Sequence, residues 1–298
     1  MNTLMTRYFK VAGHVFSLTM TDSCSLWPRL TQYDPFVTDE QDCPLFGVQL
    51  STEELERPES LELVYDPQTE PGETLVRLSR GTGLWVFDMS PDKDIPCHSH
   101  LVASEDFSQG TLYLDNRHVS DAIFGINNSL MLLYAFRSAP LDTLEMHASM
   151  VSNSGKAFLF LARSGTGKST HSQLWLDHVP GSELMNDDNP VVRVLADGTV
   201  MAYGSPWSGK TPCYRNVQAP VGAFVRIRRC PENRITPLSI LESYALLYSS
   251  SSGFKADHTI ADGLHATLEK IVTTTPCYVL DCRPDKEAAE VSSAELLK

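Results

Sequence analysis

The chain has 298 residues, of which 42% are hydrophobic and 20% charged, an ordinary globular composition that excludes an intrinsically disordered chain. Its 37 acidic residues outnumber 24 lysines and arginines, and the formal charge of -13 repels phosphate backbones and anionic membrane surfaces. We therefore expect neither nucleic acid nor a membrane as a partner.

The cysteines and the N-terminus favour a cytoplasmic protein. The seven cysteines form no CxxC pair, so they signal neither a disulfide framework nor a zinc site. Lys10, His14 and Thr19 interrupt the apolar residues near the N-terminus, so no export signal or membrane span is expected there. The oligomeric state stays open, and a homo-oligomer is compatible with the sequence.

The N-terminal half has the pattern of a β-rich domain. The cluster from Cys97 to His100 lies in a stretch rich in Pro and Asp and has no partner pair at metal-ligand spacing, so it is interpreted as a loop. Residues 121–138 carry apolar side chains at helical spacing and predict a helix that ends before Pro140. Short apolar runs between turn residues predict an antiparallel sheet over FKVAGHVFSLTM, LFGVQL, LELVY, TLVRLS, LWVFDM and TLYLD.

The helix over 121–138 divides the chain into a β-rich domain, residues 1–138, and a second domain, residues 139–298. The second domain is predicted to be mixed, which makes the fold class α/β with an α+β tendency. Asp197-Gly198 is a strong hairpin turn between two of its strands. The predicted strands are LEMHASMV, KAFLFLA, a strand into Asn186, PVVRVL, TVMAYG, VGAFVRIRR and PCYVLDC, and the predicted helices run to about His178, over LESYALLYS and over PDKEAAEVSSAELLK.

The segment ARSGTGKS, residues 162–169, has the pattern of a phosphate-binding P-loop. A strand precedes it and a helix follows it, which is the context that lets loop amides and a helix N-terminus wrap phosphates. Ala162 stands where glycine is usual. The residues expected to hold ATP or another nucleoside triphosphate are Arg163, Ser164, Gly165, Thr166, Gly167, Lys168, Ser169 and Thr170, with Ser169 also binding Mg²⁺.

A second segment, GSPWSGKT at residues 204–211, matches the P-loop pattern more literally. Pro206 and Trp207 occupy its loop, and the prolines that follow leave too little room for a helix, so we interpret it as a different structure. It is either a structural turn or a loop whose cations, Lys210 and Arg215, face the phosphates from the opposite side.

Two adjacent carboxylates, Asp187 and Asp188, follow the P-loop at the end of a predicted strand. A kinase needs carboxylate both to hold magnesium and to accept the proton of the attacking hydroxyl. Neighbouring side chains in a strand point to opposite faces, so one ligand and one base is the natural division. The alternative is that Asp-Asp-Asn-Pro only makes a turn. His147, among apolar residues, has by itself the pattern of a structural histidine.

The motifs LEMHASMV, ARSGTGKST, NDDN and YGSPWSGK, in this order, resemble the C-terminal domain of HPr kinase/phosphorylase and its relative, ATP-dependent phosphoenolpyruvate carboxykinase. The resemblance covers roughly residues 141 to 285. The N-terminal half resembles the β-rich leader of uncharacterised HPr-kinase-related bacterial proteins.

The resemblance implies roles for several residues of this chain. It implies a histidine near the catalytic centre at His147, a base at Asp187, magnesium coordination at Asp188, and phosphate-facing cations at Lys210 and Arg215. The glycine-rich signature of true HPr kinases is absent, which argues against HPr as the acceptor.

These patterns predict a kinase that uses ATP and Mg²⁺ and transfers the γ-phosphoryl group to a hydroxyl. The acceptor is a seryl group of a protein or peptide, or a small molecule such as serine. The alternatives are a nucleotide-binding sensor or scaffold without turnover and, less favoured, an enzyme of the carboxykinase type, because the further basic residues of such a site are not found here.

Overall fold

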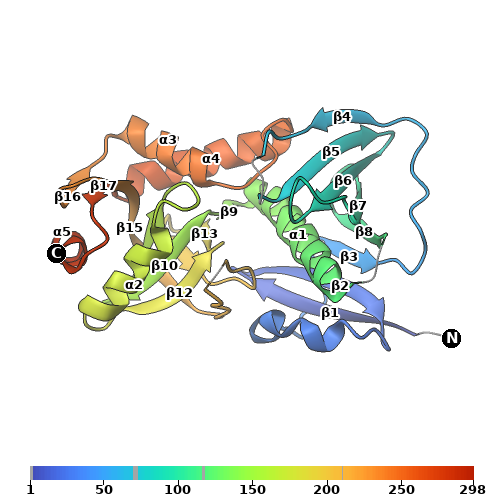
Figure 1. Ribbon diagram of the computed structural model, residues 1–298, viewed down its shortest axis with the longest axis horizontal. Helices are drawn as coiled ribbons and strands as arrows, with labels where there is room; N and C mark the ends of the chain where they lie inside the picture. The colour runs from blue at the N-terminus through green and yellow to red at the C-terminus, as the bar shows by residue number, and fades with distance from the viewer. Residues whose placement is uncertain (1–2, 70–72, 116–117, 210) are drawn as a thin grey trace. The chain divides into compact units, whose positions relative to one another are not determined.

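The computed structural model describes residues 3–69, 73–115, 118–209 and 211–298. The chain divides into two compact units, one of residues 1–10 and 14–137 and another of residues 11–13 and 138–298. Within the described residues, each unit is built on one mixed sheet with flanking helices (Figure 1). The protein is therefore of the α/β class.

The first unit contains a sheet in the order β1-β2-β3-β8-β7-β6-β5-β4. Its prediction as antiparallel is wrong in part, because β3 pairs in parallel with both β2 and β8. The run FKVAGHVFSLTM forms a hairpin, since Ala12 and Gly13 turn the chain with φ of 49° and 83°. The elements are β1 Leu4–Val11, β2 His14–Thr21, η1 Trp27–Arg29, η2 Thr31–Phe36, β3 Gly47–Leu50, β4 Glu62–Tyr65, β5 Leu75–Gly81, β6 Leu84–Ser90, β7 Ser99–Ser104, β8 Gln109–Leu114 and α1 Val119–Ser138.

The predicted helix before Pro140 is confirmed as α1, which packs against the sheet of the first unit. The ring of Tyr134 on α1 lies 5.9 Å from that of Phe16 on β2, and Phe136 lies 6.0 Å from Phe87 on β6. By length and composition alone, this helix is apolar enough to cross a membrane. Its residues Ile126 and Leu130 are fully buried, however, and therefore belong to the core of the unit.

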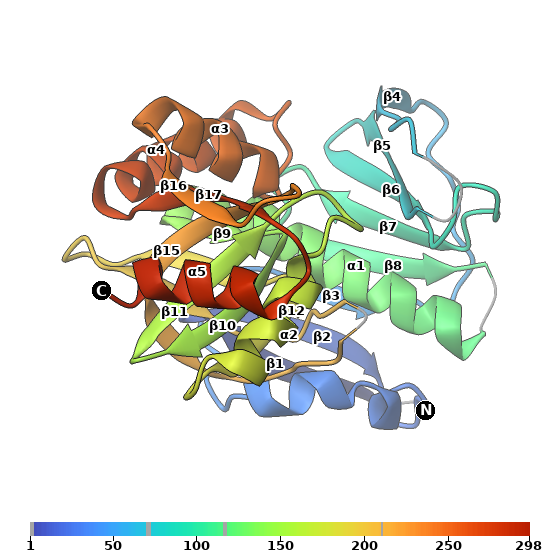
Figure 2. The same ribbon diagram turned by 60° about the vertical axis from the view of Figure 1, so that its left-hand side comes forward.

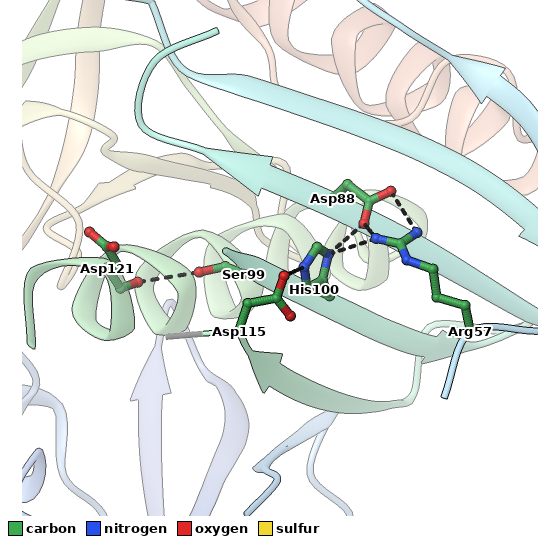
Figure 3. Close-up of polar contacts among 6 residues, drawn as sticks. All are labelled: Arg57, Asp88, Ser99, His100, Asp115 and Asp121. Atoms are coloured by element: carbon green, nitrogen blue, oxygen red, sulfur yellow. Dashed lines mark hydrogen bonds and ion pairs between the residues drawn. The ribbon is translucent and has the colours of Figure 1, made fainter. Parts of the chain in front are cut away.

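The prediction of a loop over residues 97–100 is wrong at its end, because Ser99 and His100 begin strand β7. His100 is buried between two carboxylates: Nδ1 lies 2.5 Å from Asp88 and Nε2 lies 3.1 Å from Asp115 (Figure 3). Arg57 makes two hydrogen bonds to Asp88. Burial alone would lower the pKa of His100, but the hydrogen bonds to both carboxylates outweigh it and raise that pKa.

This cluster ties the segment before β4 to β6, β7 and the end of β8. Burial opposes ionisation of Asp88, yet the hydrogen bonds from His100 and Arg57 prevail and lower its pKa to about 2. The Ser99 hydroxyl donates to the backbone oxygen of Asp121 at 3.3 Å and thereby joins β7 to α1. The polar residues of this stretch are therefore internal cross-links of the first unit.

The second unit has a sheet in the order β12-β10-β11-β15-β14-β13-β9, with β17 beside β15 and β16 beside β17. Strands β11, β15 and β17 run parallel, and their carboxyl ends share one edge. The elements are η3 Ala139–Leu141, β9 Thr143–Glu145, β10 Ala148–Asn153, β11 Lys156–Leu161, α2 Lys168–His178, β12 Glu183–Asp188, β13 Val191–Val194, β14 Val200–Tyr203, β15 Gln218–Arg229, β16 Arg234–Pro237, α3 Ile240–Ser250, α4 His258–Thr274, β17 Cys277–Cys282 and α5 Lys286–Leu296.

Two helices of this unit, α2 and α5, lie side by side over β11 (Figures 1 and 2). Phe158 and Phe160, which alternate along β11, pack their rings 5.2 and 5.6 Å from Trp175 on α2. The indole of Trp175 donates to Ser292 on α5 at 2.9 Å. This packing fixes α2, and with it the loop that joins β11 to α2.

The predicted hairpin at Asp197-Gly198 is confirmed between β13 and β14. The prediction of LEMHASMV as one strand is wrong, because the chain leaves β9 at Glu145 and enters β10 at Ala148. Strand β9 pairs with β13, whereas β10 pairs with β11 and β12. His147 lies at the junction between the two pairings.

Candidate active site

The loop between β11 and α2 has the backbone that a P-loop requires. Gly165 and Gly167 take φ of 73° and 126°, which residues with a side chain rarely adopt. Arg229, at the end of β15, donates to the carbonyl oxygens of Gly165 at 2.6 Å and Thr166 at 3.0 Å. Sequence reasoning missed Arg229, because the parallel pairing that brings β15 beside β11 joins residues more than 60 positions apart.

The other residues expected to bind nucleotide lie along this loop and the first turn of α2. Arg163, Ser164, Ser169 and Thr170 are exposed, and Thr166 is half-buried. The Thr166 amide donates to the backbone oxygen of Arg163 at 3.2 Å and closes a tight turn. The loop is thus open to solvent at the N-terminus of α2, where an anion is favoured.

Lys168 is buried at the start of α2 and lies against His147. Its Nζ atom is 2.5 Å from His147 Nε2 and donates to the Ala162 carbonyl oxygen at 3.2 Å. Burial lowers the pKa of Lys168, and the charges of Asp187 and Asp188 offset part of this effect. An ammonium group donates only, so His147 Nε2 is the acceptor and the proton of a neutral ring sits on Nδ1.

His147 is held at the strand junction by its neighbours. Its amide donates to the Ser250 carbonyl oxygen at 2.7 Å, and the Met146 amide donates to that of Pro190 at 2.9 Å. Burial, with a smaller contribution from the charge of Lys168, lowers the pKa of His147. The ring is therefore neutral at ordinary pH, and it lies 3.6 Å from the Asp188 carboxylate.

The two aspartates at the end of β12 face different partners. The Ser169 hydroxyl donates to Asp187 Oδ1 at 2.9 Å, whereas Asp188 lies toward His147. This agrees with the expectation that adjacent strand residues diverge. Asp188 also has φ of 108°, a conformation that costs a non-glycine residue on the order of 1–3 kcal/mol and is concentrated at functional sites.

The contacts of the two aspartates suit a division of labour opposite to the expected one, and the roles themselves stay predictions. Asp187 shares a hydrogen bond with Ser169, the residue expected to bind Mg²⁺, and Asp188 shares the neighbourhood of His147 and Lys168. The hydroxyl and carboxylate oxygens of Ser169 and Asp187 suit Mg²⁺, which keeps several water or phosphate ligands. Over the described ranges, no group of three or more His, Cys, Asp or Glu side chains could hold a metal ion by itself.

The described residues of this segment, 204–209 and 211, form no helix, and none begins between residue 212 and the start of β15, so the segment lacks the helix that a P-loop requires. It lies along the end of β12: the Gly209 amide and the Ser208 hydroxyl donate to the Asp187 carbonyl oxygen at 2.7 and 2.8 Å. A Cβ atom at Gly204 would lie 1.9 Å from the backbone oxygen of Arg215. The close approach of the Arg215 backbone therefore requires glycine at position 204, and this structural reason for the glycine does not depend on phosphate binding.

Of the two cations expected on this segment, the structure describes only Arg215. Lys210 lies outside the described residues. Arg215 binds the opposite end of β12 from the aspartates, with donation to the Leu184 carbonyl oxygen at 2.6 Å and to Glu183 Oε2 at 2.8 Å. Arg215 therefore contacts the start of β12 here, and its role at the phosphates stays a prediction.

One further acid, Glu145, was not singled out in the sequence. It ends β9, two residues before His147, and is 1% exposed, and neither carboxylate oxygen has a hydrogen-bond partner among the described residues. Burial raises the pKa of Glu145 to about 7; the nearby Ser252 side chain offsets this in part, and the charge of Asp188 adds to it. In the sequence, only the position of Glu145 two residues before His147 indicates that it lies near the site.

Comparisons with known proteins add little to this geometry. No family model and no curated protein matches the chain. Among solved structures, the chain is similar to that of the Hpr(Ser) kinase/phosphatase from Coxiella burnetii, with 11% identity and a TM-score of 0.31 over 50% of this chain and 86% of that chain.

Proposed function

We propose that the protein is a kinase that uses ATP and Mg²⁺ and transfers the γ-phosphoryl group to a hydroxyl acceptor. The observation that carries this proposal is the convergence of five side chains, from α2, β12 and the junction between β9 and β10, at the mouth of the P-loop. Lys168 contacts His147, His147 lies near Asp188, and Ser169 binds Asp187. A protein that only binds nucleotide has no need of a second carboxylate in a strained backbone at this point.

In the proposed reaction, the loop amides and Lys168 bind the phosphate oxygens and stabilise the charge that develops on them. Ser169 and Asp187 would hold Mg²⁺, which neutralises the phosphates and orients them. His147, with a neutral ring, positions the Lys168 ammonium through Nε2.

In this proposal, Asp188 is the general base. Its carboxylate accepts the proton of the acceptor hydroxyl as that oxygen bonds to the γ-phosphorus, and the bond to the bridging oxygen breaks to release the nucleoside diphosphate. The acceptor class that this chemistry suits is an alcohol, such as a seryl group of a protein or peptide or free serine.

The proposal is tested with γ-labelled ATP, Mg²⁺ and three separated acceptor pools: small molecules, peptides and proteins. We expect label to move from ATP into one pool with the natural protein and not with Lys168→Ala. If ATP binds tightly but no pool and no water molecule receives label, the protein is a nucleotide-binding sensor and the proposed reaction is wrong.

A further inference from the structure

A cavity of about 760 Å³ opens beside the P-loop, and its lining does not include His147, Asp187 or Asp188. Its wall includes Thr166, Gly167 and Thr170, so it is continuous with the loop and the first turn of α2. The segments that follow β15 and β17 complete it, at the shared carboxyl edge of the parallel strands. Ligands of open α/β sheets bind at this edge, and the volume lies in the range of roughly 300–1,000 Å³ typical of small-molecule sites.

We propose that this cavity holds the nucleoside of the phosphoryl donor and that it favours adenine over guanine. The inference rests on the proposed function, because it assumes that the P-loop holds a nucleoside triphosphate. It extends that function by naming the base and the residues that contact it.

The lining of the cavity has the chemistry of a base-binding site. Leu174 on α2 and Ile227 on β15 supply apolar surface, and Pro231 and Pro284 supply two rigid rings. Flat aromatic bases are bound by apolar surface of this kind with a small number of polar groups. Arg229 lines the cavity and also donates to the carbonyl oxygens of Gly165 and Thr166, so the loop and the cavity share one positioning residue.

The polar groups of the lining decide between the purines. None of the residues that line the cavity is acidic. Guanine presents adjacent N1–H and N2–H donors, which are best met by the two oxygens of a carboxylate, whereas adenine needs no charged acceptor. GTP is therefore expected to bind less tightly than ATP.

His171, also in the lining, keeps a buried acceptor without a partner. The Ser292 hydroxyl donates to the Ala288 carbonyl oxygen at 2.8 Å, so it accepts the proton of His171 Nε2 at 3.2 Å. The Nδ1 atom then carries a lone pair and has no partner among the described residues. Because Nδ1 is closed off from solvent, His171 offers ring surface, rather than a hydrogen bond, to a ligand in the cavity.

The test compares two probes, ATP and inorganic tripolyphosphate, by titration calorimetry with Mg²⁺. Tripolyphosphate reports on the P-loop alone, and ATP reports on the P-loop and the cavity together. The variants are Leu174→Trp and Cys230→Trp, which fill the cavity from α2 and from the segment after β15. The control is Leu176→Trp, on the same helix and also half-buried but not in the lining.

We expect both filling variants to lower the affinity for ATP at least about tenfold and to leave the affinity for tripolyphosphate unchanged. The control Leu176→Trp should leave both affinities unchanged. The natural protein should bind ATP more tightly than GTP. Unchanged ATP affinity in both filling variants, or a GTP affinity equal to or greater than the ATP affinity, would overturn the cavity assignment alone. If the natural protein binds neither ATP nor tripolyphosphate, the proposed function fails and this inference with it.

Discussion

Ser169 donates a hydrogen bond of 2.9 Å to Asp187 Oδ1, which joins the first turn of α2 to the end of β12. The two residues are 18 positions apart and come from different elements. Because a P-loop hydroxyl and a strand-end carboxylate are the protein ligands that P-loop enzymes use for magnesium, we propose this contact as the metal side of the site. The opposite side, toward His147 and Asp188, is then left for the acceptor.

The first prediction separates the roles of the aspartates. Asp187→Asn should raise the Mg²⁺ concentration for half-maximal phosphotransfer about tenfold or more, because a carboxylate ligand becomes a weaker amide ligand. Asp188→Asn should lower kcat by about 100-fold or more with little change in the Mg²⁺ requirement, since it removes the proton acceptor. Magnesium titrations of both variants at saturating ATP check this. The opposite pattern would restore the division expected from the sequence.

The second prediction concerns Lys168. Lys168→Ala should lower phosphotransfer by about 100-fold or more, because it removes the charge that stabilises the transferred group. Lys156→Ala, on the exposed start of β11 in the same strand-loop-helix unit, should keep full activity. Initial rates of label transfer provide the measurement. Full activity of Lys168→Ala would show that the P-loop assignment is wrong.

The third prediction concerns Gly209. A Cβ atom there would lie 2.9 Å from Asp188 Cβ and 3.1 Å from Cγ, so Gly209→Ala should displace the proposed base and reduce kcat about tenfold or more. Gly222→Ala is the contrast, because its Cβ would meet the Phe158 ring at 2.7 Å in the core. It should reduce the free energy of unfolding by about 1–3 kcal/mol and spare kcat of the folded protein. Equal effects of both variants on kcat would count against the placement of Asp188.

The fourth prediction concerns the pH dependence of stability. Burial raises the pKa of Glu145 from 4.5 to about 7 in the folded protein, so its contribution to stability is complete below pH 4.5 and lost as pH rises through 7. At about 1.4 kcal/mol per pH unit, the loss is on the order of 3 kcal/mol. Glu145→Gln does not titrate and should gain that much relative to the natural protein between pH 4.5 and 7. Denaturant unfolding at several pH values measures it; a difference that does not change with pH would refute it.

Local patterns predicted much of the fold. The apolar period of α1, the Asp-Gly turn and the strand-loop-helix around Lys168 each depend on neighbours in sequence, and each was predicted correctly. Helix α4 was not predicted. The break at His147 was missed, because an apolar run does not reveal that a chain leaves one strand partner for another. His100 was assigned to a loop for a related reason: its partners Asp88 and Asp115 come from other strands.

The sequence predicted which residues come together in the candidate site, but it did not predict how they are arranged. His147, Lys168, Ser169, Asp187 and Asp188 come together as a group, yet which aspartate meets Ser169 depends on the register of β12 against β10. The contacts of Arg215 and Arg229 depend on partners that are distant in the sequence, so they could not be predicted from local patterns. Arg215 is engaged by Glu183, 32 positions away, and Arg229 reaches the P-loop from the far end of β15.

The central claim is that this site transfers a phosphoryl group from ATP. Its most direct measurement is a single-turnover experiment, in which excess protein is mixed with γ-labelled ATP, Mg²⁺ and the fractionated acceptor pools. We predict that label leaves ATP and appears in one hydroxyl-bearing acceptor with the natural protein, and that it stays on ATP with Asp188→Asn. Label that remains wholly on bound ATP with the natural protein, in every pool, would contradict the claim.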